Sequence, residues 1–154
     1  MNHTCSLESP VGRLILTEDG SGISGLSLDT AGTCRTTEEM TPLLRAAATQ
    51  LAEYFAGKRK TFALPLSLHG TPFQRADWNA LLTIPYGETR SYLQIARQLD
   101  KPKACRAVGG ANSRNPVMII VPCHRVIAAN GSLGGYACGL NAKRFLLELE
   151  KRCR

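Results

Sequence analysis

A short apolar run at residues 117–121 (VMIIV) is bounded by Pro116 and Pro122 and leads directly into Cys123 and His124. Its β-branched residues and flanking prolines predict a buried strand or extended segment. A thiolate is a strong nucleophile, and a neighbouring imidazole can take its proton. Adjacent side chains on an extended chain point to opposite faces, so a water would bridge the pair unless the chain turns. Taken alone, the pair is better explained as a small buried thiol beside a core histidine.

The neighbours of this pair complete a longer pattern. In order along the chain they are Asn115-Pro116, the apolar run, Pro122-Cys123-His124-Arg125-Val126-Ile127 and Gly134-Gly135-Tyr136. This pattern closely resembles the O6-alkylguanine-DNA alkyltransferase family, also called the methylated-DNA–protein-cysteine methyltransferases. The resemblance runs from about residue 71 to residue 150, and the N-terminal part matches more loosely.

Charge and hydropathy limit the kind of partner. The chain has 154 residues, and its 19 Lys and Arg against 12 Asp and Glu give a net charge of +7. Such an excess favours a polyanionic partner such as nucleic acid. No stretch is apolar over the length of a membrane span, and the first residues lack the pattern of an export signal. We therefore expect a cytoplasmic monomer with no membrane partner.

The six cysteines are irregularly spaced and form no C-x-x-C pair. In a chain of this length without an export signal, free thiols are expected rather than disulfides. His3, Cys5 and Cys34 could in principle share a metal, but the ligand set that some family members use for zinc is not matched here. The prediction is no structural metal and no cofactor.

Residues 1–68 are predicted to form a supporting α/β domain. Partly alternating segments separated by turn residues predict strands at 4–9, 13–18 and 23–28. Thr41 and Pro42 then open a helix that ends at Gly57. Its apolar stripe consists of Leu43, Leu44, Ala47, Leu51, Tyr54 and Phe55. The resemblance implies a ribonuclease-H-like antiparallel sheet with a helix, followed by a linker at residues 66–70.

Residues 69–154 are predicted to form a mainly helical domain, which gives an α/β (α+β) fold class overall. A helix at 71–83 has Phe73, Ala76, Ala80 and Leu81 on one side and places Trp78 in the core. Ser91 caps a helix at 92–99, a turn follows at 100–102, and a second helix spans 103–111 and ends at Asn112. This arrangement predicts a winged-helix-like helix-turn-helix whose second helix enters a DNA groove. A structural helical hairpin with solvated charges is the alternative.

The resemblance implies a role for each candidate DNA contact. The second helix would lie in the minor groove of double-stranded DNA that contains alkylated guanine. Arg106 would enter the base stack where the damaged nucleotide leaves. Tyr92 would rotate the phosphate of that nucleotide and so flip it out of the duplex. A buried thiol cannot reach a stacked base, so the base must be extruded. The candidate DNA contacts are Arg106, Lys103, Arg114, Ala107 and Gly109; for Arg106 a simple phosphate contact is the alternative.

The resemblance also supplies the remaining site residues. Glu150, near the end of a helix at 142–151 capped by Asn141, would orient His124; without the resemblance it would be a solvated residue. The expected substrate-binding residues are Tyr92 at the guanine N3, Val126, Tyr136 and Ala137 near O6, and Asn115, which would tie the helix pair to the active-site segment. Cys138 stands where the family usually has glycine.

The implied reaction is a single, irreversible transfer of an alkyl group from O6-alkylguanine, and possibly O4-alkylthymine, to Cys123. Three alternatives stay open at this point. A thiol hydrolase would also use cysteine, histidine and an acid, and it would turn over. An alkyltransferase-like protein that recognises lesions without repairing them lacks the reactive cysteine. A transcription factor would explain residues 91–114 but not the Cys-His pair.

Overall fold

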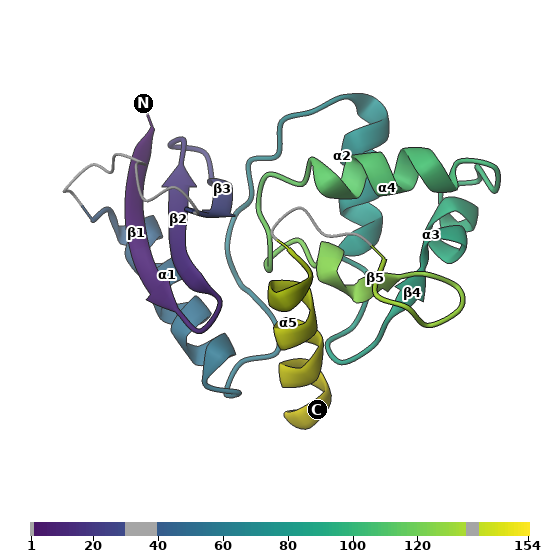
Figure 1. Cartoon of the computed structure of the whole chain (residues 1–154). Coiled ribbons are helices and arrows are strands. Elements are labelled where there is room, and N and C mark those ends of the chain that lie inside the picture. Colours follow the sequence, from purple (N-terminus) through teal and green to yellow (C-terminus); the bar gives the residue numbers. More distant parts are fainter. Residues whose placement is uncertain (1, 30–39, 135–138) are drawn as a thin grey trace. The chain divides into compact units, whose positions relative to one another are not determined.

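The structure is a computed structural model that describes residues 2–29, 40–134 and 139–154. The chain divides into two compact units, Met1–His69 and Gly70–Arg154, each with its own elements (Figure 1). Together these elements give an α+β fold. No helix in the described ranges is long and apolar enough to cross a membrane.

The first unit is built on a three-stranded antiparallel sheet. Its strands are β1 (His3–Ser9), β2 (Gly12–Glu18) and β3 (Ile23–Leu28), in the order β1-β2-β3. The predicted strands are confirmed to within one residue at each end. On the central strand, Leu14 and Leu16 are fully buried, because alternate residues of a half-covered sheet face the core.

Helix α1 (Pro42–Phe55) packs against β1 and β2. The Thr41 hydroxyl accepts a hydrogen bond from the N–H of Leu44, so the predicted cap is confirmed. Four residues of the predicted stripe are buried, while its other two, Leu43 and Phe55, are half-exposed at its edges. The four are Leu44, Ala47, Leu51 and Tyr54.

The segment predicted to be a linker begins inside this unit rather than between domains. Ile23 donates to the carbonyl of Pro65 at 2.8 Å and accepts from the N–H of Ser67 at 2.8 Å, so Leu66 forms a parallel bridge with Ile23. An edge strand offers unpaired backbone groups, and this segment satisfies part of that edge. A side chain at Gly22 would lie 2.8 Å from the Pro65 carbonyl oxygen, which explains the glycine there.

The second unit is mainly helical. Its elements are α2 (Pro72–Leu81), β4 (Arg90–Ser91), α3 (Tyr92–Gln98), α4 (Cys105–Ser113), the 3₁₀ helix η1 (Cys123–Arg125), β5 (Val126–Ile127) and α5 (Leu140–Arg152). Both α2 and α3 begin with capping boxes, at Thr71 and Ser91. The two short strands pair in parallel, with Arg90 opposite Val126. This pairing brings the start of α3 next to the end of η1.

Several predicted boundaries in this unit were wrong. Helix α4 begins at Cys105 rather than Lys103, because residues 101–104 close a turn in which Ala104 donates to Lys101. Helix α5 begins at Leu140 with Gly139 as its cap residue, and Asn141 makes no capping bond. On α2, Ala76 is exposed and Asp77 takes the buried position, while Trp78 is confirmed as a core residue.

The apolar run before Cys123 is buried as predicted, but it is not a strand. Val121 donates to the carbonyl of Val117 at 3.0 Å, and Ile120 donates to that of Met118 at 2.8 Å, so the chain turns repeatedly. Ile119 has a φ of 72°, which is rare for a β-branched residue. The apolar run correctly predicted that these side chains are buried, but it wrongly predicted an extended backbone. A short apolar run is compatible with a buried strand and also with a buried series of turns.

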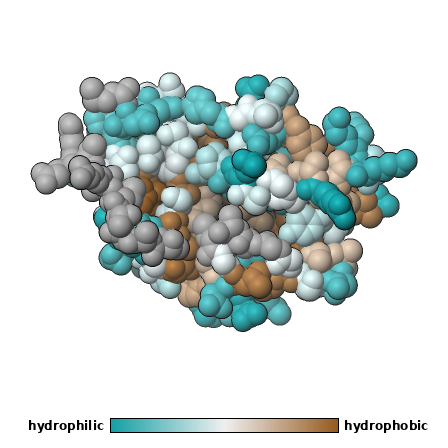
Figure 2. Space-filling model, turned by 45° about the horizontal axis from the view of Figure 1, so that its top comes forward, coloured by the Kyte–Doolittle hydropathy of each residue, from teal (hydrophilic) through white to brown (hydrophobic). Residues whose placement is uncertain are grey.

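Hydrophilic side chains cover most of the face drawn in Figure 2, and hydrophobic residues show in separate patches. Among the described residues the exposed large hydrophobic side chains are Met40, Leu82 and Leu140. Scattered apolar side chains of this kind are ordinary on a globular surface.

Candidate active site

The reactive pair lies on a turn rather than on a strand. Cys123 opens η1 and donates its N–H to the carbonyl of Val121 at 2.8 Å, and Arg125 donates to Pro122 at 3.0 Å. Cys123 is 6% exposed and His124 is fully buried. The chain therefore turns where the extended alternative would have placed the two side chains on opposite faces.

His124 pairs with Glu150 of α5. Its Nε2 lies 2.6 Å from Oε2 of Glu150, and both side chains are withdrawn from solvent. A carboxylate can only accept, so Nε2 carries the proton and Nδ1 is left as the basic nitrogen. Nδ1 is buried and has no hydrogen-bond partner within the described part of the chain. The imidazole is thus held with its lone pair available to accept a proton.

Arg125 holds the same carboxylate from the other side. Its Nε donates to Oε1 of Glu150 at 2.8 Å and its Nη2 to Oε2 at 3.1 Å. Its Nη1 donates to the Ile84 carbonyl at 2.6 Å, and the N–H of Gly87 donates to Oε1 at 3.1 Å. Two parallel bonds from a guanidinium fix a carboxylate more firmly than a single contact does.

The charges in this cluster follow from the pairing. Burial acts to raise the pKa of Glu150, but hydrogen bonds and charge from His124 and Arg125 outweigh it, and the pKa lies well below its ordinary value. Burial lowers the pKa of His124, and the positive charges of Arg125 and Lys143 lower it further, against the opposing effect of Glu150. We conclude that Glu150 is ionised and His124 neutral before reaction.

Lys143 on α5 is a buried cation that the sequence did not single out. Its Nζ donates to the carbonyl of Val126 at 2.6 Å and also to that of Leu133. Burial lowers the pKa of Lys143, while its electrostatic interaction with Cys123 raises it. Its spacing of three residues from buried Leu146 and seven from Glu150 places it on the inward face of the helix, and this spacing was the available signal.

Asn115 fixes the turn that leads to the cysteine. Its Nδ2 donates to the carbonyl of Val121 at 2.8 Å, and its Oδ1 accepts from the N–H of Val117 at 3.0 Å. One side chain thus bonds to both ends of the buried run. Because Asn115 lies two residues after the end of α4, it connects that helix with the cysteine segment.

Tyr92 lies at the start of α3, between two glycines. A side chain at Gly134 would lie 2.7 Å from its hydroxyl oxygen, and one at Gly109 would lie 3.8 Å from its ring. Gly134 also has a φ of 67°, which favours glycine. Of the other expected substrate-binding residues, Val126 donates its N–H to Cys123 and is buried. Tyr136 and Ala137 lie outside the described residues, as does Cys138.

The candidate DNA contacts gather around α4. Arg106 and Ala107 are exposed on the helix, and Lys103 and Arg114 are exposed just before and after it. Gly109 is half-buried beside Tyr92, while Val108 and Ala111 face the core. The helix therefore presents a face with small side chains, and basic residues lie along and beside that face.

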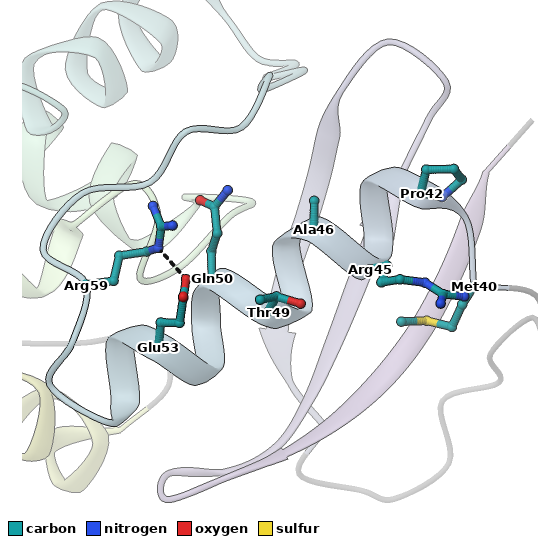
Figure 3. Close-up of a pocket in the computed structure, with 8 residues that line it drawn as sticks. All are labelled: Met40, Pro42, Arg45, Ala46, Thr49, Gln50, Glu53 and Arg59. Atoms are coloured by element: carbon teal, nitrogen blue, oxygen red, sulfur yellow. Dashed lines mark hydrogen bonds and ion pairs between the residues drawn. The ribbon is translucent and has the colours of Figure 1, made fainter.

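A groove on the first unit offers a different kind of surface. Figure 3 shows it along one face of α1, where the dashed line marks the 2.8 Å ion pair between Arg59 and Glu53. Its lining residues are Met40, Pro42, Arg45, Ala46, Thr49, Gln50, Glu53 and Arg59. None of these is a nucleophile paired with a base, so the cysteine segment is the candidate for chemistry.

The structure describes two of the three residues that could share a metal, His3 and Cys5. Cys5 lies on β1 and is buried, which raises the pKa of its thiol, and Cys34 lies outside the described residues. Within the described ranges, no group of three or more His, Cys, Asp or Glu side chains is placed to hold a metal ion.

The fold and the site define an α+β protein in which a buried cysteine precedes a buried histidine paired with a glutamate. The family model for the 6-O-methylguanine DNA methyltransferase DNA binding domain matches residues 72–152, and the model for its ribonuclease-like domain matches residues 3–68. The chain belongs to the 6-O-methylguanine DNA methyltransferase family, and the resemblance seen in the sequence is confirmed.

Relatives and solved structures agree over nearly the whole chain. A methylated-DNA–protein-cysteine methyltransferase of Methanosarcina acetivorans is 49% identical, over 95% of this chain and 96% of its own. One from Mycobacterium leprae is 53% identical, over 98% of this chain and 93% of its own. The crystal structure of the Mycobacterium tuberculosis protein OGT in complex with DNA has a TM-score of 0.89 and 51% identity, covering 98% of this chain and 94% of that chain.

Proposed function

We propose that this protein repairs DNA by transferring the alkyl group of O6-alkylguanine to its own Cys123. The observation that carries the proposal is a buried chain of hydrogen bonds from Arg125 to Glu150 to Nε2 of His124. This chain leaves Nδ1 of His124 able to accept a proton. The relatives named as methylated-DNA–protein-cysteine methyltransferases support it. The protein acts as a monomer inside the cell, in the cytoplasm, where its DNA substrate lies.

The chemistry begins with a proton transfer. A water takes the thiol proton of Cys123 and passes a proton to Nδ1 of His124, which becomes an imidazolium stabilised by Glu150. The thiolate attacks the alkyl carbon in line with its bond to O6. The carbon–sulfur bond forms as the carbon–oxygen bond breaks, and the electron pair leaves with the guanine.

Two further groups lower the barrier. Lys143 is a buried cation that interacts electrostatically with Cys123, so its charge stabilises the thiolate before attack. Tyr92 supplies a hydroxyl at the guanine N3, where the departing base gains negative charge. Val126, Tyr136 and Ala137 line the base pocket around O6, and Asn115 holds the cysteine turn against α4.

DNA binding belongs to residues 69–154, and residues 1–68 support that domain. Helices α3 and α4 act as a helix-turn-helix, with α4 in the minor groove of the duplex. Arg106 fills the gap in the stack after the alkylguanine is extruded, because a planar guanidinium can stack on bases. Lys103 and Arg114 contact phosphates, and Ala107 and Gly109 allow close approach of the helix to the groove.

The product explains why each molecule reacts once. An S-alkylcysteine is a thioether, and the carboxylate, imidazole and water of this site cannot displace its sulfur. No cofactor is needed because the lesion itself carries the alkyl group. A thiol hydrolase built on the same residues would instead release its product and turn over.

The test is intact-mass measurement after mixing with a duplex that contains O6-methylguanine. The expected result is a gain of one methylene unit per protein molecule, located on the peptide that carries Cys123. Cys123→Ala is the matched control, and it should keep lesion binding while gaining no mass. Release of more product than there is protein, or alkylation on Cys138 in place of Cys123, would overturn the proposal.

A further inference from the structure

A buried carboxyl group lies at the interface between α2 and α4. Asp77 of α2 is 0% exposed, and it faces Asn112 near the end of α4. With the amide NH₂ of Asn112 turned toward the carboxyl, Nδ2 donates to Oδ2 of Asp77 at 2.5 Å and to Oδ1 at 3.3 Å. The same nitrogen donates to the carbonyl of Val108 at 3.2 Å.

The next residue of α2 makes a second bond to the same end of α4. Nε1 of Trp78 donates to the carbonyl of Ala111 at 2.9 Å, and the indole is buried. Adjacent residues of α2 therefore bond to adjacent residues of α4. These side-chain bonds join α2 to the end of α4, three residues before Asn115.

The interface lacks a positive charge to balance an ionised Asp77. Burial alone raises the pKa of Asp77, to about 7. Helix α2 packs against α3, α4 and η1. The titratable and charged groups on these elements, with Arg75 on α2 itself, are Tyr92, Arg97, Cys105, Arg106, Cys123, His124 and Arg125. Burial is the cause of the raised pKa, and none of these groups adds a charge effect to it.

The two protonation states of Asp77 suit this interface unequally. With its NH₂ toward Asp77, Asn112 donates to the carboxyl in either state, but only the neutral carboxyl avoids burying a charge. An ionised carboxylate with a single amide donor is costly to bury, and opening the helix pair to water relieves that cost. Proton loss therefore favours separation of α2 and α4 at the end of α4.

We propose that Asp77 is a proton-dependent positioning residue that holds α4 against α2 when protonated and loosens it when ionised. The inference rests on the proposed DNA-binding role of α4 and concerns the regulation of that same site. A loosened α4 would hold Arg106 less firmly in the groove, and the Asn115 link to the cysteine segment would lose part of its support. Reaction on duplex DNA would therefore decline as the pH rises, relative to reaction on a free base.

The first experiment compares two substrates across the titration of Asp77. Single-turnover transfer rates are measured on an O6-methylguanine duplex and on a free O6-alkylguanine base, from about pH 6 to about pH 8. The ratio of the two rates cancels the pH dependence of the chemistry at Cys123. For the unaltered protein this ratio should fall by about fivefold or more, the lower range of a typical coupling.

Asp77→Asn keeps the shape and an oxygen that can accept from Asn112 while removing the titration, so its ratio should stay flat. Glu148→Gln is the matched control, because it removes one negative charge from an exposed position on α5 and should keep the fall. Parallel profiles for the unaltered protein and Asp77→Asn would overturn the proposal. If neither substrate is dealkylated at any pH, the proposed function fails instead.

A second readout needs neither DNA nor catalysis. Trp78 is the single tryptophan of the chain and lies at this interface, so its fluorescence reports on the helix pair directly. Its emission should shift to longer wavelength as the pH rises through about 7, and acrylamide should quench it more strongly. Asp77→Asn should show neither change. A shift of the same size in Asp77→Asn, or no shift in the unaltered protein, would show that Asp77 does not control the interface.

Discussion

Nε2 of His124 and Oε2 of Glu150 lie 2.6 Å apart, and the same carboxylate accepts two bonds from Arg125. The glutamate thus sets the histidine tautomer and also balances a buried cation. A substitution cannot separate its effect on the His124 tautomer from its ion pair with Arg125, because any change that neutralises Glu150 leaves the Arg125 charge unbalanced.

We predict that Glu150→Gln destabilises the protein by about 3–5 kcal/mol, the usual cost of breaking a buried ion pair by removing one partner. The amide would also direct donors toward Arg125, and alkyl transfer to Cys123 should slow. Urea unfolding and single-turnover rates measure the two effects. Glu148→Gln, an exposed change on the same helix, should leave both near their original values. A stability loss below about 1 kcal/mol would mean that Arg125 does not depend on this carboxylate.

Asp77 predicts an unusual dependence of stability on pH. Below its ordinary pKa of 3.8 the carboxyl is protonated in the folded and unfolded chains alike, and it has no effect. Between 3.8 and about 7 the folded protein keeps a proton that the unfolded chain releases, so each rise in pH lowers the stability. Above about 7 the loss is complete. Its size is on the order of 4 kcal/mol at most.

Asp77→Asn should therefore be more stable than the unaltered protein at pH 8 and lose this slope. Chemical denaturation at a series of pH values measures whether the free energy of unfolding falls as the pH rises. If the two proteins have equal stability at pH 8 and their curves run parallel below it, Asp77 does not titrate in this range.

The role of Arg106 can be separated from that of a phosphate contact. If it fills the stack, Arg106→Ala should slow repair of duplex DNA much more than it weakens binding to undamaged DNA, because extrusion costs a few kcal/mol that the side chain offsets. Arg106→Lys should restore charge but remain slow on duplex. Single-turnover rates on duplex and on free base measure this difference, with Lys103→Ala as the charge-matched comparison. Full activity of Arg106→Lys on duplex would reduce Arg106 to an electrostatic contact.

Much of the fold followed from local patterns in the sequence. The three strands were predicted from alternation and turn residues, and the starts of α1, α2 and α3 from Thr or Ser followed by helix-forming residues. The error at residues 117–121 has a physical origin. The side chain of Asn115 supplies the hydrogen bonds that a neighbouring strand would otherwise supply, and such a contact leaves no periodic mark in the sequence.

The sequence predicted those site residues that belong to a recognisable motif. It did not predict the charged residues that are buried, because charged side chains are usually assigned to the surface. Cys123 and His124 stood out as a pair, whereas Arg125 and Lys143 are cations, and cations are normally assigned to the surface. Their partners are Glu150, Ile84 and two backbone carbonyls on distant parts of the chain. Likewise Asp77 took a core position because Asn112, far along the sequence, offers it a hydrogen bond.

The left-handed backbone at Ile119 has an evolutionary consequence. Glycine would relieve about 1–2 kcal/mol of conformational strain there, yet the side chain is buried, and deleting it would cost about 2–5 kcal/mol through the cavity it leaves. A change to glycine alone therefore costs more through the cavity than it gains in backbone strain. A glycine here would be favourable only together with a larger neighbouring side chain that fills the cavity. The sequence of the segment before Cys123 should accordingly change more slowly in evolution than the backbone strain at Ile119 alone would suggest.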